Sequence, residues 1–372
     1  MKIGNTTFIP QNIAPENAKS LAIYDGDTKI CSIDISKMKP TNLGAKKYSA
    51  TLLADTHTST MEAYNASNVQ ADLITAVSWS AENADLLCVV GDLAQFKNCE
   101  KDPGLAKHKE IMDANRGNLL VLEEPGNHEH FTTDATIEPI NDDEIKQYTG
   151  FPLYYTVSNQ PTDESKRNYY SAIVGDDVYI MCGNVGWYEC FNDASNQWLY
   201  EVLERFRNRR CFLCVHPPLE GTQYCGDALN VITYDGIGSY KTVFISLLKH
   251  YKNVIYIHGH THAMLEMQDY LQGLANPLPA NYDFANGIHS IHNPSLAISR
   301  DISSGERVDV VATSQGYLMD VYENHIVLRG IDFTKVGTDE SEFIPIAHYC
   351  LDTTLQIVEA GTYADSTGTI TT

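Results

Sequence analysis

The sequence lacks any run of about 18 apolar residues, so no part of its 372 residues is long and apolar enough to span a membrane as a helix. The N-terminal stretch, MKIGNTTFIPQNIAPENAK, also lacks the basic segment followed by an apolar segment that marks a secretory signal. These absences predict a cytoplasmic protein without a membrane partner. The mature product of a processed precursor would begin in the same way, so that alternative stays open.

Basic residues are also scarce. The chain has 26 Lys and Arg residues against 48 Asp and Glu residues, with a formal net charge of -22 and a pI of about 4.8. Because affinity for nucleic acid rests mostly on Lys and Arg side chains that neutralise phosphates, this balance argues against a nucleic-acid partner. One basic patch within the acidic average would still permit a nuclease.

The nine cysteines form no recognisable disulfide framework, because their number is odd and their spacing is irregular. Cys211 and Cys214 have CxxC spacing, but they lie in an apolar, strand-like run. In a strand, that spacing places the two thiols on opposite faces. We therefore expect reduced thiols in the core of a cytosolic protein.

Apolar runs predict three buried strands in the first half of the chain, at 49–54, 85–90 and 118–122. Helices are expected between them, at 61–84 and 104–115. A unit of strand, helix and strand takes about 30 residues or more, which fits this spacing. The pattern predicts an α/β fold.

Polar residues follow directly where each of these strands ends. The three segments are Asp55-Thr-His57, Gly91-Asp92 and, after a Pro-Gly turn, Asn127-His128-Glu129. Asp92 lies 37 positions after Asp55, and Asn127 lies 35 positions after Asp92. We therefore expect all three segments at the carboxyl edge of one sheet, where open α/β sheets place their chemistry.

Two later strands, expected at 211–215 and 253–257, also end in polar residues. The first ends in His216, and the second ends in the segment HGHTH, which carries His260 and His262. A hairpin at 168–174 and 177–183 and a helix at 196–209 precede them. Beyond residue 262 the pattern predicts an antiparallel β region, with strands at 287–292, 308–313, 316–321 and 325–333.

The polar residues collected from these strand ends suit a metal site: Asp55, His57, Asp92, Asn127, His128, His216, His260 and His262. Carboxylates, imidazoles and an amide, with no thiolate, favour Mn, Fe, Zn, Co or Ni. Without His128, the seven remaining residues are too many ligands for one open tetrahedral site, but they fit two metal ions that share a bridging ligand. Two-metal hydrolases hold their ions about 3.5–4 Å apart.

The order of these motifs, D-x-H, G-D, G-N-H-E, H and G-H-x-H, resembles the calcineurin-like metallophosphoesterases over about residues 50–262. The resemblance implies a four-layer α/β/β/α sandwich, in which two mixed β-sheets are flanked by helices. It also implies a domain at 49–350, preceded by an extension at 1–48 with a β-hairpin and followed by a tail or edge strand at 351–372. The polar segment 131–166 is expected to be an excursion from the sheet, a long loop that passes over its edge.

The resemblance implies two sets of metal ligands with Asp92 as the bridge: Asp55, His57 and His262 for one ion, and Asn127, His216 and His260 for the other. The ions would be Mn, Fe or Zn, and a hydroxide bridging them would attack phosphorus in line. The substrate would be a small phosphate mono- or diester, such as a nucleotide. Two divalent ions, two aspartates and the hydroxide leave a charge of about +1 to attract a phosphoryl group.

His128 would act as the general acid or steady the phosphate, but one position near it departs from the family. Many members carry an Asp three residues after the bridging aspartate, and purple acid phosphatases carry a metal-binding Tyr there. This chain has Gln95, so we set the purple acid phosphatases aside. Without that Asp, His128 lacks a carboxylate that would favour its charged form.

Two alternatives remain open. The same fold could be a metal- or phosphate-binding module or a structural component with weak or lost catalysis. The presence of Gln95 where many family members carry an Asp favours this interpretation. An amidohydrolase would place an H-x-H motif first in the chain, whereas His260-Thr-His262 comes last. His258 could extend that motif to H-x-H-x-H, although Gly259 argues for a turn. The remaining histidines, His108 and His292 among them, are expected to be ordinary core or surface residues.

Overall fold

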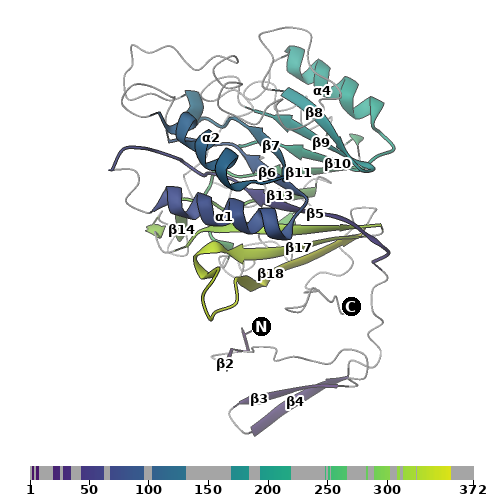
Figure 1. Cartoon of the computed structure of the whole chain (residues 1–372). Helices are drawn as coiled ribbons and strands as arrows, with labels where there is room; N and C mark the ends of the chain where they lie inside the picture. The colour runs from purple at the N-terminus through teal and green to yellow at the C-terminus, as the bar shows by residue number, and fades with distance from the viewer. Residues whose placement is uncertain are drawn as a thin grey trace.

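The computed structural model of the chain describes residues 2–3, 6–7, 20–25, 28–34, 43–62, 68–95, 103–130, 169–183, 193–218, 248, 250–251, 253–265, 282–283, 289–301, 308–310, 313–323 and 325–352 (Figure 1). The expected excursion at 131–166 lies outside these residues. Within them, no helix has the length and apolar character needed to cross a membrane.

The first of two six-stranded sheets has the strand order β18-β17-β16-β5-β6-β7. Its strands are β5 (Lys46–Leu53), β6 (Leu86–Val90), β7 (Leu120–Glu124), β16 (Gln315–Tyr322), β17 (His325–Asp332) and β18 (Phe343–Asp352). The strands β5, β6 and β7 are parallel, as predicted, whereas β16, β17 and β18 join them as an antiparallel meander. The carboxyl ends of β5, β6 and β7 therefore meet at one edge.

The second sheet has the strand order β12-β13-β11-β10-β9-β8. Its strands are β8 (Tyr169–Val174), β9 (Asp177–Cys182), β10 (Cys211–Cys214), β11 (Val254–His258), β12 (Tyr282–Asp283) and β13 (His289–His292). The four central strands are parallel, and the two outermost strands are antiparallel to their neighbours. The predicted hairpin is the pair β8 and β9.

Three short pairs of strands complete the described β structure: β1 (Lys2–Ile3) with β2 (Thr6–Thr7), β3 (Ser20–Asp25) with β4 (Thr28–Asp34), and β14 (Ser299–Asp301) with β15 (Val308–Val310). Two 3-10 helices are η1 (His128–His130) and η7 (Phe333–Lys335). The boundaries of the extension, domain and tail stay predictions.

The helices α1 (Val69–Asn83), α2 (Gly104–Asn115) and α4 (Asp193–Arg205) form the outer layers. Alternate residues of each strand face different cores, because successive strand side chains point to opposite sides. In β6, Cys88 faces the core between the two sheets, and Leu87 faces the core under α1 and α2. The opposite outer core joins α4 to the second sheet, so that α4 lies beside β8, β9 and β10 in Figure 1. The four-layer sandwich is confirmed.

The two cysteines of the CxxC segment face different cores, as expected. Cys211 lies in the outer core with α4, and Cys214 lies in the core between the sheets. Both thiols are buried and reduced. Burial raises the pKa of Cys211 to about 12, so this thiol stays protonated at neutral pH.

Some predicted boundaries were wrong. The first helix begins at Val69 rather than residue 61, because Asn68 just before it has left-handed backbone (φ 60°), which a right-handed helix cannot include. The third strand continues through the two acids predicted to end it. Glu124 stays in the strand because its Oε2 accepts a hydrogen bond from the backbone N–H of Cys182 at 2.8 Å. The strand β18 was not predicted.

Candidate metal centre

The predicted site residues lie at the carboxyl edges of both sheets, which face each other there. Asp55 and His57 follow β5, and Asp92 follows β6 in the first sheet. His216 follows β10, and the HGHTH segment leaves β11 in the second sheet. Backbone bonds hold the loops in register, since the N–H of Asp55 donates to the carbonyl of Gly91 at 3.1 Å. The site therefore lies between the sheets.

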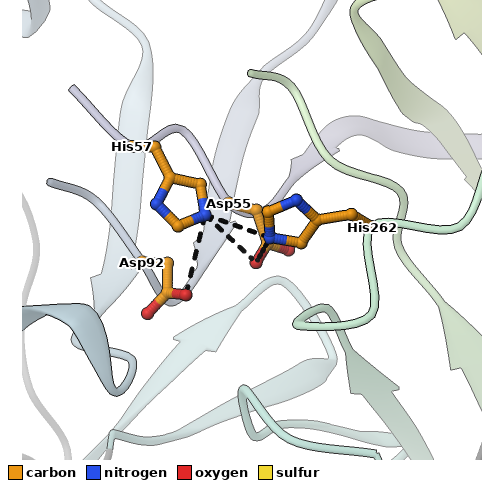
Figure 2. Close-up of side chains that lie close together, drawn as sticks. All are labelled: Asp55, His57, Asp92 and His262. Atoms are coloured by element: carbon orange, nitrogen blue, oxygen red, sulfur yellow. Dashed lines mark hydrogen bonds and ion pairs between the residues drawn. The ribbon is translucent and has the colours of Figure 1, made fainter. Parts of the chain in front are cut away.

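One group of side chains gathers Asp55, His57, Asp92 and His262 (Figure 2). The Nε2 atoms of His57 and His262 lie 3.0 Å apart, and His262 Nε2 lies 3.0 Å from Asp55 Oδ1. His57 Nε2 lies 3.8 Å from both Asp55 Oδ1 and Asp92 Oδ2. Two carboxylates and two imidazoles thus point their lone-pair atoms at one small region.

A second group gathers Asp92, His216 and His260. His216 Nε2 lies 3.0 Å from Asp92 Oδ2 and 3.2 Å from His260 Nδ1. Asp92 belongs to both groups, and the carboxylate and imidazole residues of each group are those that the resemblance assigns to one ion. That these side chains hold metal stays a prediction.

Asp92 presents a single oxygen to both groups. Its Oδ1 accepts a hydrogen bond from the backbone N–H of His128 at 2.9 Å, so only Oδ2 faces His57 and His216. Asn127, just before His128, is 8 % exposed, and its Oδ1 has no hydrogen-bond partner. An amide oxygen buried without a partner is the kind of group that a metal ion satisfies.

The backbone at this edge is strained. Among the described residues, six that are not glycine have positive φ, and five of them are predicted ligands: Asp55 (53°), His57 (43°), Asp92 (51°), His260 (73°) and His262 (61°). Left-handed backbone costs such residues about 1–2 kcal/mol each. Strain of this kind concentrates at functional sites, where the surrounding fold holds it in place.

Two motif glycines allow side chains to approach closely. A Cβ atom on Gly126 would lie 2.2 Å from Asp92 Oδ1, and a Cβ atom on Gly259 would lie 2.6 Å from Asp55 Oδ2. Both distances are far below van der Waals contact. The glycines of GNHE and HGHTH are therefore required for the carboxylates to reach their places.

Backbone carbonyls orient two of the imidazoles. His216 Nδ1 donates to the carbonyl of Val90 at 2.9 Å, and His262 Nδ1 donates to the carbonyl of Ile298 at 2.8 Å. In each ring this places the proton on Nδ1 and turns Nε2 into the site, as outer partners of metal-binding histidines do. Sequence reasoning missed Ile298, since a backbone acceptor carries no residue signature.

His128 is oriented by Gln95, but through the main chain. Its Nδ1 donates to the Gln95 carbonyl at 2.8 Å, and its Nε2 lies 3.9 Å from Asp92 Oδ2. The ring also meets the ring of His57 edge-on, with centroids 4.5 Å apart. The backbone at position 95, rather than its side chain, therefore orients His128. The ring is held in this way although the chain has Gln95 where many family members have Asp.

His216 and Asp92 shift each other's pKa values in opposite directions. Burial alone would lower the pKa of His216, but the carboxylates of Asp92 and Asp55 outweigh it and raise that pKa to about 10. Burial would likewise raise the pKa of Asp92, but His216 and His128 hold it well below its usual range. Without a metal, a proton on His216 occupies the space beside Asp92. A metal ion would displace that proton.

Three of the predicted ligands, His57, His260 and His262, have neutral imidazoles. Burial lowers the pKa of His57 and His262 well below the ordinary value, and the charges of His128 and Arg300, respectively, add to this. Burial and His216 lower the pKa of His260 to about 3. A neutral imidazole with a lone pair directed inward is the form that binds metal.

These groups fit a pair of metal ions. His262 donates through Nδ1, so its Nε2 lone pair faces Asp55 Oδ1 at 3.0 Å, and that oxygen accepts no hydrogen bond. Two lone-pair atoms this close repel each other unless a cation lies between them. The mixed nitrogen and oxygen donors suit Mn, Fe or Zn.

The remaining histidines named above lie apart from the two groups. His258 is fully buried, and its ring packs 5.2 Å from that of His292 and 5.9 Å from Tyr256, whose side chain faces the core with α4. His108 is also buried, and its Nε2 lies 2.8 Å from Glu123 Oε1. Both side chains of that pair are buried. The pair lies next to the loop that carries Asp55 and His57, since His108 Nδ1 lies 3.4 Å from the hydroxyl of Thr58 in that loop.

Known proteins share this architecture. The solved structure of a dimetal phosphatase from Danio rerio is similar over 81 % of this chain and 99 % of that one, with a TM-score of 0.54 and 12 % identity. The structure of PhoD is similar over 86 % of this chain and 73 % of that one, with a TM-score of 0.52 and 11 % identity. No curated protein matches the sequence.

At these identities the two structures establish the fold alone. The sequence model of one family, the calcineurin-like phosphoesterases, matches residues 49–264, which is more than half of the chain. The matched segment contains every motif that carries the resemblance, from Asp55 to His262. The chain therefore belongs to the calcineurin-like phosphoesterase family.

Proposed function

We propose that this protein is a two-metal phosphoesterase that hydrolyses a small phosphate mono- or diester, such as a nucleotide. The observation that carries the proposal is the pair of side-chain groups that share Asp92 Oδ2. Each group directs imidazole nitrogens and carboxylate oxygens at one point, and the two points are joined by a single atom. A bridging carboxylate of this kind is what holds two ions close together.

The proposed ligands divide between two ions: Asp55, His57 and His262 for the first, Asn127, His216 and His260 for the second, and Asp92 for both. When bound, the ions would supply a shared hydroxide nucleophile at neutral pH for in-line attack and would neutralise charge on the phosphoryl oxygens. The carbonyls of Val90 and Ile298 keep two of the imidazoles in the binding tautomer.

His128 is proposed as the residue that meets the leaving oxygen or a phosphoryl oxygen. Its ring contacts His57 and is anchored through Nδ1, so Nε2 is the nitrogen that points toward Asp92. A ring held at the edge of the two groups can pass a proton to a leaving alkoxide, which is general acid catalysis.

The first experiment measures metal content per chain by mass spectrometry, together with hydrolysis of p-nitrophenyl phosphate and bis(p-nitrophenyl) phosphate with and without added Mn. We expect about two metal ions per chain and turnover that rises on Mn addition. We also expect Mn to raise the melting temperature, since a ligand at 100 times its Kd adds about 2.7 kcal/mol to the free energy of unfolding.

Two metal ions without turnover on either ester would instead favour the metal- or phosphate-binding module. Substoichiometric metal after Mn loading, with no change in melting temperature, would refute the two-metal site.

A further inference from the structure

A buried serine lies next to the loop that carries Asp55, in the segment that follows β13. Ser295 is fully buried and forms a parallel β-bridge with Ala54, the residue just before Asp55. The N–H of Leu296 donates to the carbonyl of Ala54 at 3.0 Å. The carbonyl of Ser295 in turn accepts from the N–H of Gln315, in β16, at 3.2 Å. Backbone bonds therefore fix Ser295 against the end of β5.

The hydroxyl of Ser295 uses its full hydrogen-bonding capacity. It accepts hydrogen bonds from the backbone N–H groups of Ala297 at 3.2 Å and Ile298 at 3.1 Å. A hydroxyl has one proton and two lone pairs, so its proton is left for the carbonyl of Asp55, which lies 3.2 Å from Oγ. One side chain therefore joins the loop of Asp55 to the segment that contains Ile298.

Both ends of this connection lead to ligands of the first group. The carbonyl of Ile298 accepts from His262 Nδ1 at 2.8 Å, which turns Nε2 of that ring toward Asp55 Oδ1. The carbonyl of Asp55 is held by the Ser295 hydroxyl and by the N–H of Ala297. Asp55 and His262 come from different sheets (Figure 2), yet their facing atoms lie only 3.0 Å apart. Ser295 therefore links two ligands that the chain brings together from separate layers.

The second group does not depend on Ser295 in this way. The ring of His216 is oriented by the carbonyl of Val90, whose strand β6 pairs with β5 and β7 on its two sides. Within the described part of the chain, the Ser295 hydroxyl bonds only to the Asp55 carbonyl and to the N–H groups of residues 297 and 298. Removal of the hydroxyl should therefore act mainly on the first group.

We propose that Ser295 is a positioning residue for the first metal ion, whose hydroxyl holds Asp55 and His262 in the arrangement that binds this ion. The proposal rests on the two-metal phosphoesterase function. Removal of a group that orients a metal ligand from outside typically weakens metal binding by about tenfold to hundredfold. In Ser295→Ala the Asp55 carbonyl loses one of its two bonds, and Ile298, whose carbonyl orients His262, loses its anchor.

The test measures Mn binding to Ser295→Ala in two backgrounds that each keep one group of ligands. His216→Ala retains the first group, and His262→Ala retains the second. The matched control is Ser80→Ala, because Ser80 is also fully buried and its hydroxyl donates to the carbonyl of Ala76 within α1 at 2.6 Å. Calorimetric titration gives the Mn Kd, and thermal melts of the metal-free proteins give the loss of stability.

We expect Ser295→Ala to raise the Mn Kd about tenfold to hundredfold in the His216→Ala background and less than about threefold in the His262→Ala background. With all ligands present and about two equivalents of Mn, electron paramagnetic resonance should show a coupled Mn pair in the wild type and mainly isolated ions in Ser295→Ala. Ser80→Ala should lower the melting temperature by a similar amount but leave both Kd values and the coupled signal unchanged.

A second variant, Ser295→Cys, repeats the comparison if Ser295→Ala does not fold. It keeps a side chain of similar shape, but a thiol is only a weak donor and acceptor. The same selective weakening of the first ion is expected.

Equal weakening in the two backgrounds, or no weakening in either, would overturn the role of Ser295 while leaving the phosphoesterase function in place. Weakening confined to the first group, in a protein that hydrolyses neither ester, would support the positioning role and reject the hydrolase. A wild-type protein that binds no more than one Mn ion would overturn both proposals.

Discussion

Two buried polar clusters lie at opposite edges of the sandwich, and they are built in opposite ways. The amino-edge network consists of Tyr48, Asp177, Tyr179 and Arg210. Arg210 binds both carboxylate oxygens of Asp177, at 3.0 and 2.7 Å, and the hydroxyl of Tyr48 donates to the same carboxylate at 2.8 Å. This network joins the two sheets with its charges paired.

The metal edge, defined by Asp55, His57, Asp92, Asn127, His216, His260 and His262, is not closed in this way. Asp55 Oδ1 and Asn127 Oδ1 are buried and accept no hydrogen bond, and five of the seven residues have left-handed backbone. A polar cluster that satisfies itself serves the fold, whereas one that leaves buried acceptors open is complete only with a ligand. The difference supports the proposal that the metal edge binds metal ions.

The largest effect that would test this contrast is expected from Asp92→Asn. The amide keeps the shape but removes the negative charge that both groups share. We expect metal content to fall from about two ions to one or fewer, and kcat/KM to fall at least a hundredfold, since metal ions contribute several kcal/mol to transition-state stabilisation. Metal analysis and ester hydrolysis measure this. Unchanged metal content would contradict the shared role of Asp92.

A smaller effect, on stability alone, is expected when the amino-edge network is opened by Arg210→Met. The change leaves Asp177 buried without its cation, which should lower the free energy of unfolding by about 3 kcal/mol. Turnover of the Mn-loaded protein should stay unchanged at temperatures well below the transition. Urea unfolding measures the loss.

The matched control for that variant is Arg207→Met. Arg207 is exposed and pairs with Glu204 on the surface, so its removal should change the free energy of unfolding by less than about 0.5 kcal/mol. Comparable losses for the two variants would show that the amino-edge network is no more important to the fold than a surface pair.

The smallest effect is expected at Asp72, outside both regions, in the first turn of α1. Burial and the neighbouring Asp332 raise the pKa of Asp72 from 3.8 to about 7. Below pH 3.8 Asp72 is protonated in both states and has no effect. As the pH rises toward 7 only the unfolded chain ionises, so stability falls, and above pH 7 the loss is complete.

Asp72→Asn removes this loss. Because the side chain is partly exposed, we expect a gain of about 1 kcal/mol at pH 8 that disappears near pH 4. Thermal melts at the two pH values measure the difference. An equal gain at both would show that the ionisation of Asp72 is not its cause.

Much of the site was predictable because strand ends carry local signals. Apolar runs that stop just before Asp55 and Gly91 indicated where two of the strands end, and β5, β6 and β7 are parallel as expected. Parallel strands bring their carboxyl ends together, so sequence spacing alone placed these three segments at one edge. The antiparallel pairing of β16 and β17 after the helices was also predicted.

Local signals failed where tertiary contacts decided the outcome. The acids at the end of β7 looked like a strand terminus, but Glu124 bonds to Cys182 and Glu123 to His108, so both stay in the strand. No sequence pattern indicates those partners, because they lie 58 and 15 positions away. The edge strand β18 was missed as well.

The sequence by itself determined which side chains lie at the strand ends, since residue type and strand periodicity are properties of the local chain. Only the tertiary structure decided that His216 and His262 approach Asp92 and Asp55 from a second sheet. It also decided that backbone carbonyls orient their rings and that Ser295 joins Asp55 to the segment that orients His262. Contacts between sheets and bonds to the main chain depend on packing across the whole fold, and carbonyl groups are the same at every residue.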